Sequence, residues 1–311
     1  MLDHTWLLND QKAALASAPF VASTISVSNH LSGWLRGNNY QSSHVRSGLY
    51  IKDSQIAVCL MNQALEFLQR AMGNTAAHYM LAKNGLETWA RVTNYYASYF
   101  SVHGLLCLQG RTITELQLDR AVRVQVVPVD LRRHVFGITT RDIGRNPHHK
   151  TPWTRFYNIY NSYEVSHDAY ARVSKTAYIT DPTDESIERN LINYTPFVGF
   201  SEVQDLNRHQ EFTSLFEEYL SALEGKATLE EFLSDLQGYA TDPECKYFAR
   251  TLLRLALAGD ILLALREVSH TLEDAWAFTT RRWESFLRTI FAEIDNCYLL
   301  RFVPLIGTSP S

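Results

Sequence analysis

The segment Leu86–Arg111 reads LETWARVTNYYASYFSVHGLLCLQGR, and no other part of the chain is patterned so strongly over such a length. Its apolar and aromatic residues recur at the i, i+3, i+4 and i+7 spacing of one helical face. The small residues Ala97, Ser98, Ser101 and Gly104 interleave with them, so that partner helices can approach closely. The segment therefore predicts a buried central helix. Its expected buried face consists of Trp89, Val92, Tyr96, Tyr99, Phe100, His103, Leu106 and Cys107.

Residues typical of helix caps and helix ends, on either side of this segment, predict where helices begin and end. Gly110 stands where a C-terminal cap is expected, because glycine adopts the left-handed conformation that closes many helices. Upstream, Asp53 predicts the N-cap of an amphipathic helix that runs to about Met72. Gly73 is expected to end that helix, and a short helix from Thr75 then leads into the central one.

Composition bounds the class of protein. The 311 residues are 46% apolar, enough to bury one large core or two modest ones, and the net charge of -4 gives no overall nucleic-acid signature. No apolar run reaches the roughly 18–20 residues of a membrane span, and the N-terminus has no basic region typical of a signal peptide. Four widely spaced cysteines indicate reduced core thiols in a cytoplasmic protein, not disulfides or zinc ligands. They are Cys59, Cys107, Cys245 and Cys297.

The character of the chain changes after Gly110. Residues 116–136 are rich in valine and leucine with partial alternation, which predicts a strand or a hairpin, and Pro128 favours an edge position. Residues 119–150 contain seven Lys or Arg, three acidic residues and three His. They form either a solvated insertion or a surface that contacts phosphates. The basic residues proposed for that surface are Arg132, Arg133, Arg141, Arg145 and Lys150.

Helical patterns occupy most of the remaining chain. They cover 9–35, 153–163, 185–194, 212–223, 228–238, 243–258 and 260–300, the last expected to be split. Residues 202–235 are acidic, which suits a solvent-facing surface or a basic protein partner. Without a convincing linker, the expected architecture is one mainly α domain over 1–311. It is a multi-helix bundle with a small β-hairpin insertion at 112–150 and a helical C-terminal part at 201–311.

Motifs of common chemistries are missing from the sequence. It has no GxGxxG, GxxxxGK[ST], HExxH or GxSxG, which argues against nucleotide hydrolysis, dinucleotide redox chemistry and serine hydrolysis. Two polar segments remain as candidate sites, Arg141–His149 and Glu188–Tyr194.

The second segment, together with the central helix, resembles the HEPN superfamily. YYASYFSVHGLL (95–106) is similar to the helix of aromatic and small residues in these helical bundles, and active HEPN ribonucleases carry an Arg, usually a polar residue next, and a His four to six residues after the Arg. Here Arg189-Asn190 matches the start of the motif, whereas Tyr194 stands where the His is expected. The resemblance covers about residues 75–200. It implies metal-independent RNA cleavage without a cofactor, in a toxin or antiviral protein whose cleft forms across a homodimer.

The chemistry of such a site explains its residue types. Arg189 would stabilise charge on a phosphate, because its fork of donors matches phosphate oxygens, and Asn190 would orient the reacting groups. A tyrosine has a pKa near 10, so Tyr194 is a weak base at pH 7. The site then either binds RNA without cutting it or takes its missing group from His148 or His149 of the basic loop.

Structural alternatives stand beside each assignment. Arg189 has an acidic residue, Glu185, one helical turn earlier, and could form an ordinary surface salt bridge with it. His148 and His149 could be a solvated pair, and no metal site is expected because no carboxylate or thiol lies at ligand spacing near them. His103 is expected to be a hydrogen-bonded core histidine.

Three interpretations of function remain open. The chain is an RNA-acting HEPN-like protein, a non-catalytic helical subunit that binds a protein partner in a larger complex, or a nucleic-acid binder that uses the basic hairpin. An Arg189 directed into a cleft supports the first interpretation, and an Arg189 paired with Glu185 on open surface supports the second. Salt-dependent RNA binding without cleavage supports the third.

Overall fold

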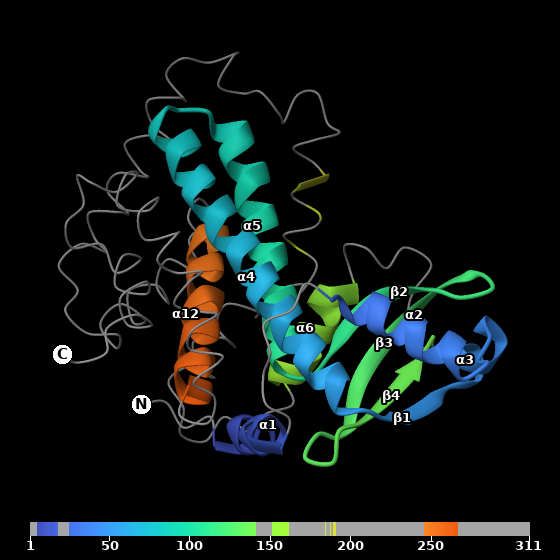
Figure 1. The fold of residues 1–311 in the computed structure, drawn as a ribbon. Helices are drawn as coiled ribbons and strands as arrows, with labels where there is room; N and C mark the ends of the chain where they lie inside the picture. Colours follow the sequence, from blue (N-terminus) through green and yellow to red (C-terminus); the bar gives the residue numbers. More distant parts are fainter. Residues whose placement is uncertain are drawn as a thin grey trace.

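The structure, a computed structural model, describes residues 5–17, 25–140, 151–161, 184, 187, 189, 190 and 246–266. These residues are mostly helical, as predicted, and they include an antiparallel sheet of four strands in place of a hairpin (Figure 1). The described helices are α1 (Thr5–Ser17), α2 (Val27–Gly37), α3 (Ser42–Ser47), α4 (Ser54–Lys83), α5 (Glu87–Leu108), α6 (Thr151–Asn161) and α12 (Lys246–Arg266). The strands are β1 (Leu49–Lys52), β2 (Thr112–Gln117), β3 (Ala121–Asp130) and β4 (Val135–Thr139).

Helix α4 is one continuous helix of 30 residues. Its predicted start is confirmed, because the side chain of Asp53 accepts a hydrogen bond from the backbone N–H of Gln55 at 2.8 Å. The predicted end at Gly73 is wrong, and so is the separate helix from Thr75. A glycine inside a helix costs only about 1 kcal/mol relative to alanine. That cost is offset because the buried face continues beyond it through Ala76, Tyr79 and Ala82.

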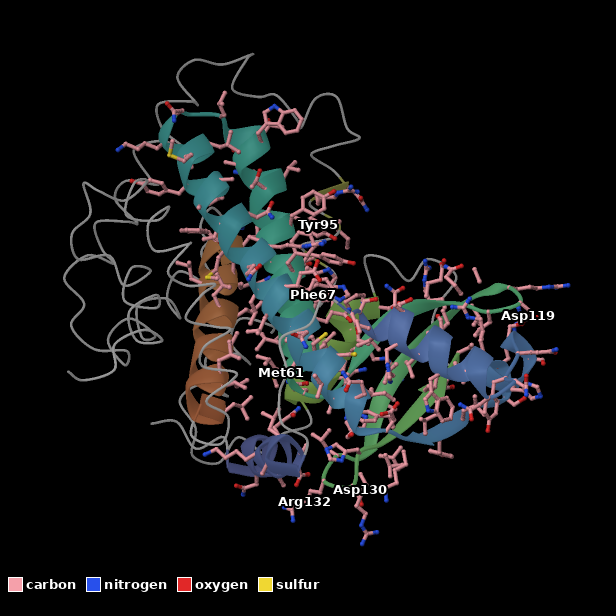
Figure 2. The ribbon with its side chains drawn as sticks, viewed as in Figure 1. Met61, Phe67, Tyr95, Asp119, Asp130 and Arg132 are labelled. Atoms are coloured by element: carbon pink, nitrogen blue, oxygen red, sulfur yellow. The ribbon has the colours of Figure 1, made fainter. Side chains whose placement is uncertain are left out.

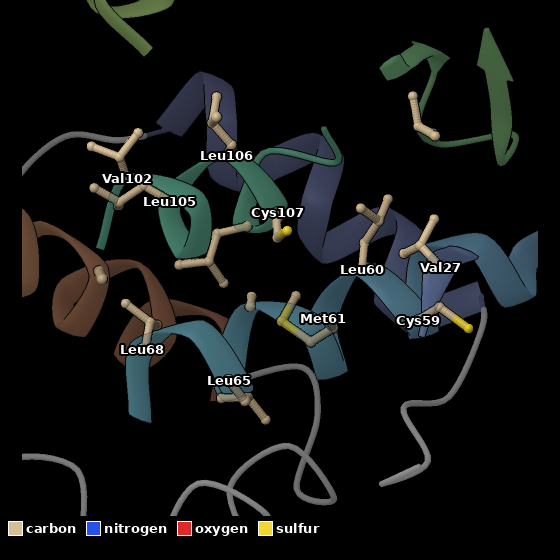
Figure 3. Packing of buried hydrophobic residues seen from close by; sticks show 14 of the residues in the cluster. Val27, Cys59, Leu60, Met61, Leu65, Leu68, Val102, Leu105, Leu106 and Cys107 are labelled. Carbon is tan, nitrogen blue, oxygen red and sulfur yellow. The ribbon is translucent and has the colours of Figure 1, made fainter. Parts of the chain in front are cut away.

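Helices α4 and α5 form an antiparallel pair that turns at Gly85, whose φ is 69° (Figure 1). Close approach occurs at Gly104, where a Cβ atom would lie 2.8 Å from Cγ of Leu68. Figure 3 shows Leu65 and Leu68 of α4 in the same cluster of buried side chains as Val102 and Leu105 of α5. The prediction that small residues admit a neighbouring helix is thus confirmed.

The end of α5 follows the predicted capping. Gly110 has a φ of 76° and donates its N–H to the carbonyl of Cys107 at 2.9 Å, while the N–H of Arg111 bonds Leu106 at 2.9 Å. The chain then turns directly into β2. The expected buried face is confirmed at Val92, His103, Leu106 and Cys107, whereas Tyr96, Tyr99 and Phe100 are partly exposed and Trp89 is 51% exposed. Its position in the first turn, at the loop end of the helix pair, leaves its indole partly in solvent.

The sheet has the order β1-β4-β3-β2, and all its neighbours are antiparallel. Strand β1 was not predicted, because four residues between two helices carry little periodicity. Pro128 lies in the inner strand β3 opposite Phe136, so its predicted edge position is wrong. The register shifts between Pro128 and Asp130, and such a bulge tolerates a residue without an N–H.

Helix α2 packs along β2 and protects this edge of the sheet (Figure 1). The hydroxyl of Ser28 donates to the carbonyl of Glu115, and the N–H of Gln117 donates to the hydroxyl of Ser32 at 2.9 Å. The two serines are one helical turn apart, so both reach the same strand. An exposed strand edge is prone to pair with other chains. The two serine hydroxyls form hydrogen bonds with two backbone groups of this edge, the carbonyl of Glu115 and the N–H of Gln117.

Helix α12 lies beside α5 and runs parallel to it. Thr251 donates to the side-chain oxygen of Asn94 at 3.0 Å, and the buried Arg254 donates to the hydroxyl of Ser98. The guanidinium of Arg254 also lies 4.9 Å from the ring centre of Trp153 on α6. Polar residues of α5 therefore bind α12, whereas Gly104 of α5 admits α4.

Other predicted helices have mixed outcomes. Helix α6 matches the predicted 153–163 within two residues at each end. The predicted 9–35 is two helices, since Ser26 caps a separate α2, and the predicted break near residue 259 is absent from α12. The predicted helices 212–223 and 228–238 lie outside the described residues, as does most of 185–194. The single domain over 1–311 stays a prediction.

Candidate functional site

Arg189 packs on the central helix. Its Nη2 donates to the hydroxyl of Tyr96 at 3.1 Å, and its guanidinium carbon lies 5.9 and 6.0 Å from the ring centres of Tyr95 and Tyr96. Its Nη1 donates to the side-chain oxygen of Asn190 at 3.0 Å. Arg189 is half-buried and Asn190 is exposed. The two described residues of the predicted motif thus lie together, and the aromatic face of α5 supports them.

The rings along this side of α5 form a continuous row. Tyr95 and Tyr96 are 5.3 Å apart between centroids, and Tyr99 lies 5.6 Å from Phe100 and 4.5 Å from His103. Offset and edge-to-face contacts of this kind stabilise aromatic clusters beyond the area they bury. The row follows from the helical spacing of these residues, which brings them onto neighbouring turns.

Helix α4 contributes a further ring, Phe67, that packs against this row. Phe67 stacks on Phe100 at 6.2 Å and lies 4.9 Å from His103 (Figure 2 labels Phe67 and Tyr95). We call Tyr96, Tyr99 and Phe100 the aromatic ladder, because all three are partly exposed while the opposite side of α5 is buried.

Two further arginines approach the aromatic ladder. Arg70 of α4 lies 5.8 Å from the ring centre of Phe100, and its guanidinium also pairs with Glu66 one turn earlier. Arg123 of β3 pairs with Glu115 at 3.6 Å. Burial raises the pKa of Tyr99 above its usual value of 10.0, and the positive charge of Arg123 acts against that rise. Arg70 and Arg189 therefore lie over rings of this row, and the charge of Arg123 acts on Tyr99.

His103 is buried at the end of the row, as predicted for a core histidine. Burial lowers its pKa to about 4, so the ring is neutral at pH 7. Its Nε2 atom has no hydrogen-bond partner among the described residues, which departs from the prediction of a hydrogen-bonded ring. A neutral imidazole between Phe67 and Tyr99 acts as a packing group and not as a proton carrier.

The predicted basic surface is described only at Arg132 and Arg133. Both are exposed, but Arg132 pairs with Asp10 of α1 at 2.6 Å and Arg133 with Asp130 at 3.5 Å. Figure 2 places Arg132 at the β3–β4 turn beside α1, away from Tyr95. The structure thus does not bring these two arginines to Arg189. The other predicted residues, Arg141, Arg145, His148, His149, Lys150, Glu185 and Tyr194, lie outside the described residues.

The described part of the chain contains no candidate site for a metal ion or for a reactive thiol. No group of three or more His, Cys, Asp or Glu side chains gathers there in a way that could hold a metal ion. Cys59 and Cys107 are buried free thiols, as predicted for these two. Burial raises the pKa of Cys107 to about 12, so it does not form a thiolate near neutrality. None of the described helices is long and apolar enough to cross a membrane.

Sequence reasoning missed the roles of Arg70 and Arg123. Arg70 lies three residues after Phe67 on a helix, which places both on one face, and this spacing was a usable signal. The electrostatic effect of Arg123 on Tyr99 depends on the tertiary fold, and no local pattern indicates it.

No protein-family model matches the chain, and comparisons with curated proteins and with solved structures found no match either. The HEPN resemblance therefore rests on the residues quoted for it.

Proposed function

We propose that the protein acts on RNA as a HEPN-like protein, with Arg189 as the residue that contacts the phosphate. The observation that supports this proposal is the position of its guanidinium, held by the Tyr96 hydroxyl and the Asn190 side chain over two tyrosine rings. An arginine fixed in this way loses less conformational freedom when it binds a phosphate than a free surface arginine does.

The proposed reaction is metal-independent cleavage at a phosphodiester. The 2′-hydroxyl of the ribose gives its proton to a base, supplied by His148 or His149, and its oxygen bonds to phosphorus, while the bond from phosphorus to the 5′-oxygen breaks and that oxygen takes up a proton from water. Arg189 stabilises the negative charge on the phosphate oxygens during this exchange, and Asn190 orients the reacting groups by hydrogen bonds. Tyr194 occupies the motif position of the family's His, and as a neutral phenol it donates a hydrogen bond or a proton more readily than it accepts one.

A second candidate function is a non-catalytic subunit that binds a protein partner. One observation favours it: Tyr50 is 79% exposed and Val129 is 55% exposed, and both lie near Gly137 on one face of the sheet. Exposed apolar groups that lie next to each other are typical of protein-binding surfaces.

A direct test incubates the purified protein with total RNA, with and without a chelator of divalent metals. We expect RNA binding or cleavage that persists in chelator, is lost in Arg189→Ala and is not restored in Arg189→Lys, because an ammonium cannot make the bidentate contact. Tyr194→His is expected to raise cleavage. Arg46→Ala on the exposed surface of α3 serves as the control for loss of one positive charge.

Circular dichroism and thermal unfolding establish that each variant is folded. A folded Arg189→Ala protein that binds and cleaves RNA like the wild type would rule out this site. Binding of a partner protein with no effect on RNA would favour the second candidate.

A further inference from the structure

We infer that the aromatic ladder is a stacking surface for single-stranded RNA, along which the strand continues from Arg189 toward Arg70. This inference rests on the proposed function and extends it, because it names the form of RNA and the residues beyond Arg189 that hold it. The ladder consists of Tyr96, Tyr99 and Phe100.

The three rings of the ladder are partly open to solvent. Two sides of α5 are closed by packing, since Gly104 meets Leu68 of α4 and Ser98 is bonded to Arg254 of α12. The ladder lies on a different side, and each of its rings keeps part of its surface open. Tyr95, by contrast, is 4% exposed and belongs to the core.

Positive charge at the ladder favours an anionic ligand. The chain has a net charge of -4, yet positive side chains from separate parts of the fold converge on the ladder. Arg189 lies over Tyr96, and Arg70 of α4 lies over Phe100. Rings interleaved with arginines match a ligand with flat bases and anionic linkages, which is the chemistry of a nucleic-acid strand.

The rings of the ladder favour a single strand over a duplex. In an RNA duplex the bases are stacked on each other and their faces are closed, so proteins read its shape and its backbone. Only an unpaired strand offers base faces to tyrosine and phenylalanine rings. Successive turns of α5 rise by about 5.4 Å, so rings four residues apart offer separate stacking positions.

Two carboxylates limit the charge of this surface. Glu66 pairs with Arg70, and Glu115 pairs with Arg123 at 3.6 Å. A phosphate that binds either arginine must compete with its carboxylate. Neutralising these acids is therefore expected to tighten RNA binding, a result that a purely structural role for the arginines does not predict.

The test measures fluorescence anisotropy of a labelled 12-nucleotide single-stranded RNA, and of the same sequence as a duplex, against the full chain. We expect the single strand to bind at least tenfold more tightly than the duplex. Arg70→Gln, Arg123→Gln and Tyr96→Leu should each weaken single-strand binding roughly fivefold or more, as loss of one stacking or phosphate contact implies. Glu66→Gln and Glu115→Gln should strengthen it.

Arg46→Gln is the matched control, because Arg46 is exposed on α3 and belongs to no part of the ladder. Arg70 is 53% exposed, so its variant is expected to fold even if Arg123→Gln does not. Equal affinity for duplex and single strand would overturn the inference. So would unchanged single-strand binding in Arg70→Gln and Tyr96→Leu while Arg189→Ala abolishes it, and that result would leave the proposed function standing. No RNA binding by the wild type would overturn both.

Discussion

The Nε2 atom of His30 lies 2.7 Å from the Oδ2 atom of Asp53, and this pair joins α2 to the first turn of α4. The other carboxylate oxygen of Asp53 accepts the N–H of Gln55, and the N–H of Asp53 donates to the carbonyl of His134 at 3.0 Å. One residue therefore caps the longest described helix, binds a second helix and joins both to the β3–β4 turn.

Replacing Asp53 is expected to separate capping from ion pairing. Asp53→Ala should lower the free energy of unfolding by about 1–2 kcal/mol at pH 7 because the N-cap acceptor is lost. Asp53→Asn keeps an acceptor and should lose less. Urea unfolding measures both, and equal losses in the two variants would show that the cap contributes little.

Asp53 also makes the free energy of unfolding depend on pH. Burial alone would raise the pKa of Asp53, but the hydrogen bonds from His30 and from the Gln55 N–H lower it below the usual 3.8. A carboxyl with a lowered pKa in the folded protein stabilises the fold above its unfolded pKa, and this contribution is lost as the pH falls through the folded value. The acid limb of the stability curve should therefore be shallower in Asp53→Asn.

His103 makes a separate contribution at higher pH. Its pKa is about 4 in the folded chain, against an ordinary value of 6.5, so between these values the unfolded chain binds an additional proton. Stability then falls as the pH drops from about 6.5 to 4, by up to about 1.4 kcal/mol per pH unit for one group. His103→Phe should remove this slope while keeping the contacts to Phe67 and Tyr99.

At pH 7 the free energy of unfolding of His103→Phe should stay within about 1 kcal/mol of the wild type, because the buried Nε2 that lacks a described partner is removed. Chemical unfolding from pH 4.5 to 7.5 measures the slope. His78, whose pKa burial also lowers to about 4, remains in the variant and sets the residual dependence. An unchanged slope would contradict the assignment to His103.

The contact at Gly104 predicts a specific double-mutant result. Gly104→Ala places a methyl group against Leu68 and should cost about 1–3 kcal/mol, because the leucine must shift. Combined with Leu68→Ala, the total loss should be smaller than the sum of the single losses. Gly33→Ala is the control, since a Cβ there meets nothing within 4 Å and a helical alanine is favourable. Strict additivity would argue against the close crossing.

The hydrogen bond between Ser32 and the edge of β2 should protect one backbone amide from hydrogen exchange. In Ser32→Ala the N–H of Gln117 loses its partner at 2.9 Å, so its exchange should become faster while the amides of β3 keep their protection. The free energy of unfolding should fall by about 1 kcal/mol. Ser47→Ala, which removes only a bond to Ser43 within α3, should leave Gln117 unchanged.

Local signals predicted much of the helical framework. The periodicity of 86–111, the cap at Asp53 and the glycine at 110 placed α5 and two helix ends correctly, because these depend on residues close in sequence. The helix end predicted at Gly73 was wrong, since the apolar face buried on both sides of Gly73 outweighs the low helix propensity of one glycine. Strand β1 was missed because β4, more than 80 residues later, provides its pairing.

The candidate site was only partly predictable for the same reason. The motif drew attention to Arg189 and Asn190 through their chemistry, but the bond from Arg189 to Tyr96 spans 93 residues. Arg70 joins the same surface only after α4 and α5 have packed. The chemistry of single residues was therefore readable from the chain, whereas their assembly on α5 was not.

The unbroken length of α4 restricts how this chain can vary. The helix begins at the junction with α2 and the β3–β4 turn and continues along α5 to Lys83. Each residue advances a helix by about 1.5 Å and rotates it by about 100°. Insertion of a single residue near its middle would turn one end away from its partners whichever end stayed in place. Insertions and deletions should thus be confined to the connections between elements. The length of α4 sets a constant distance between the sheet and the aromatic ladder.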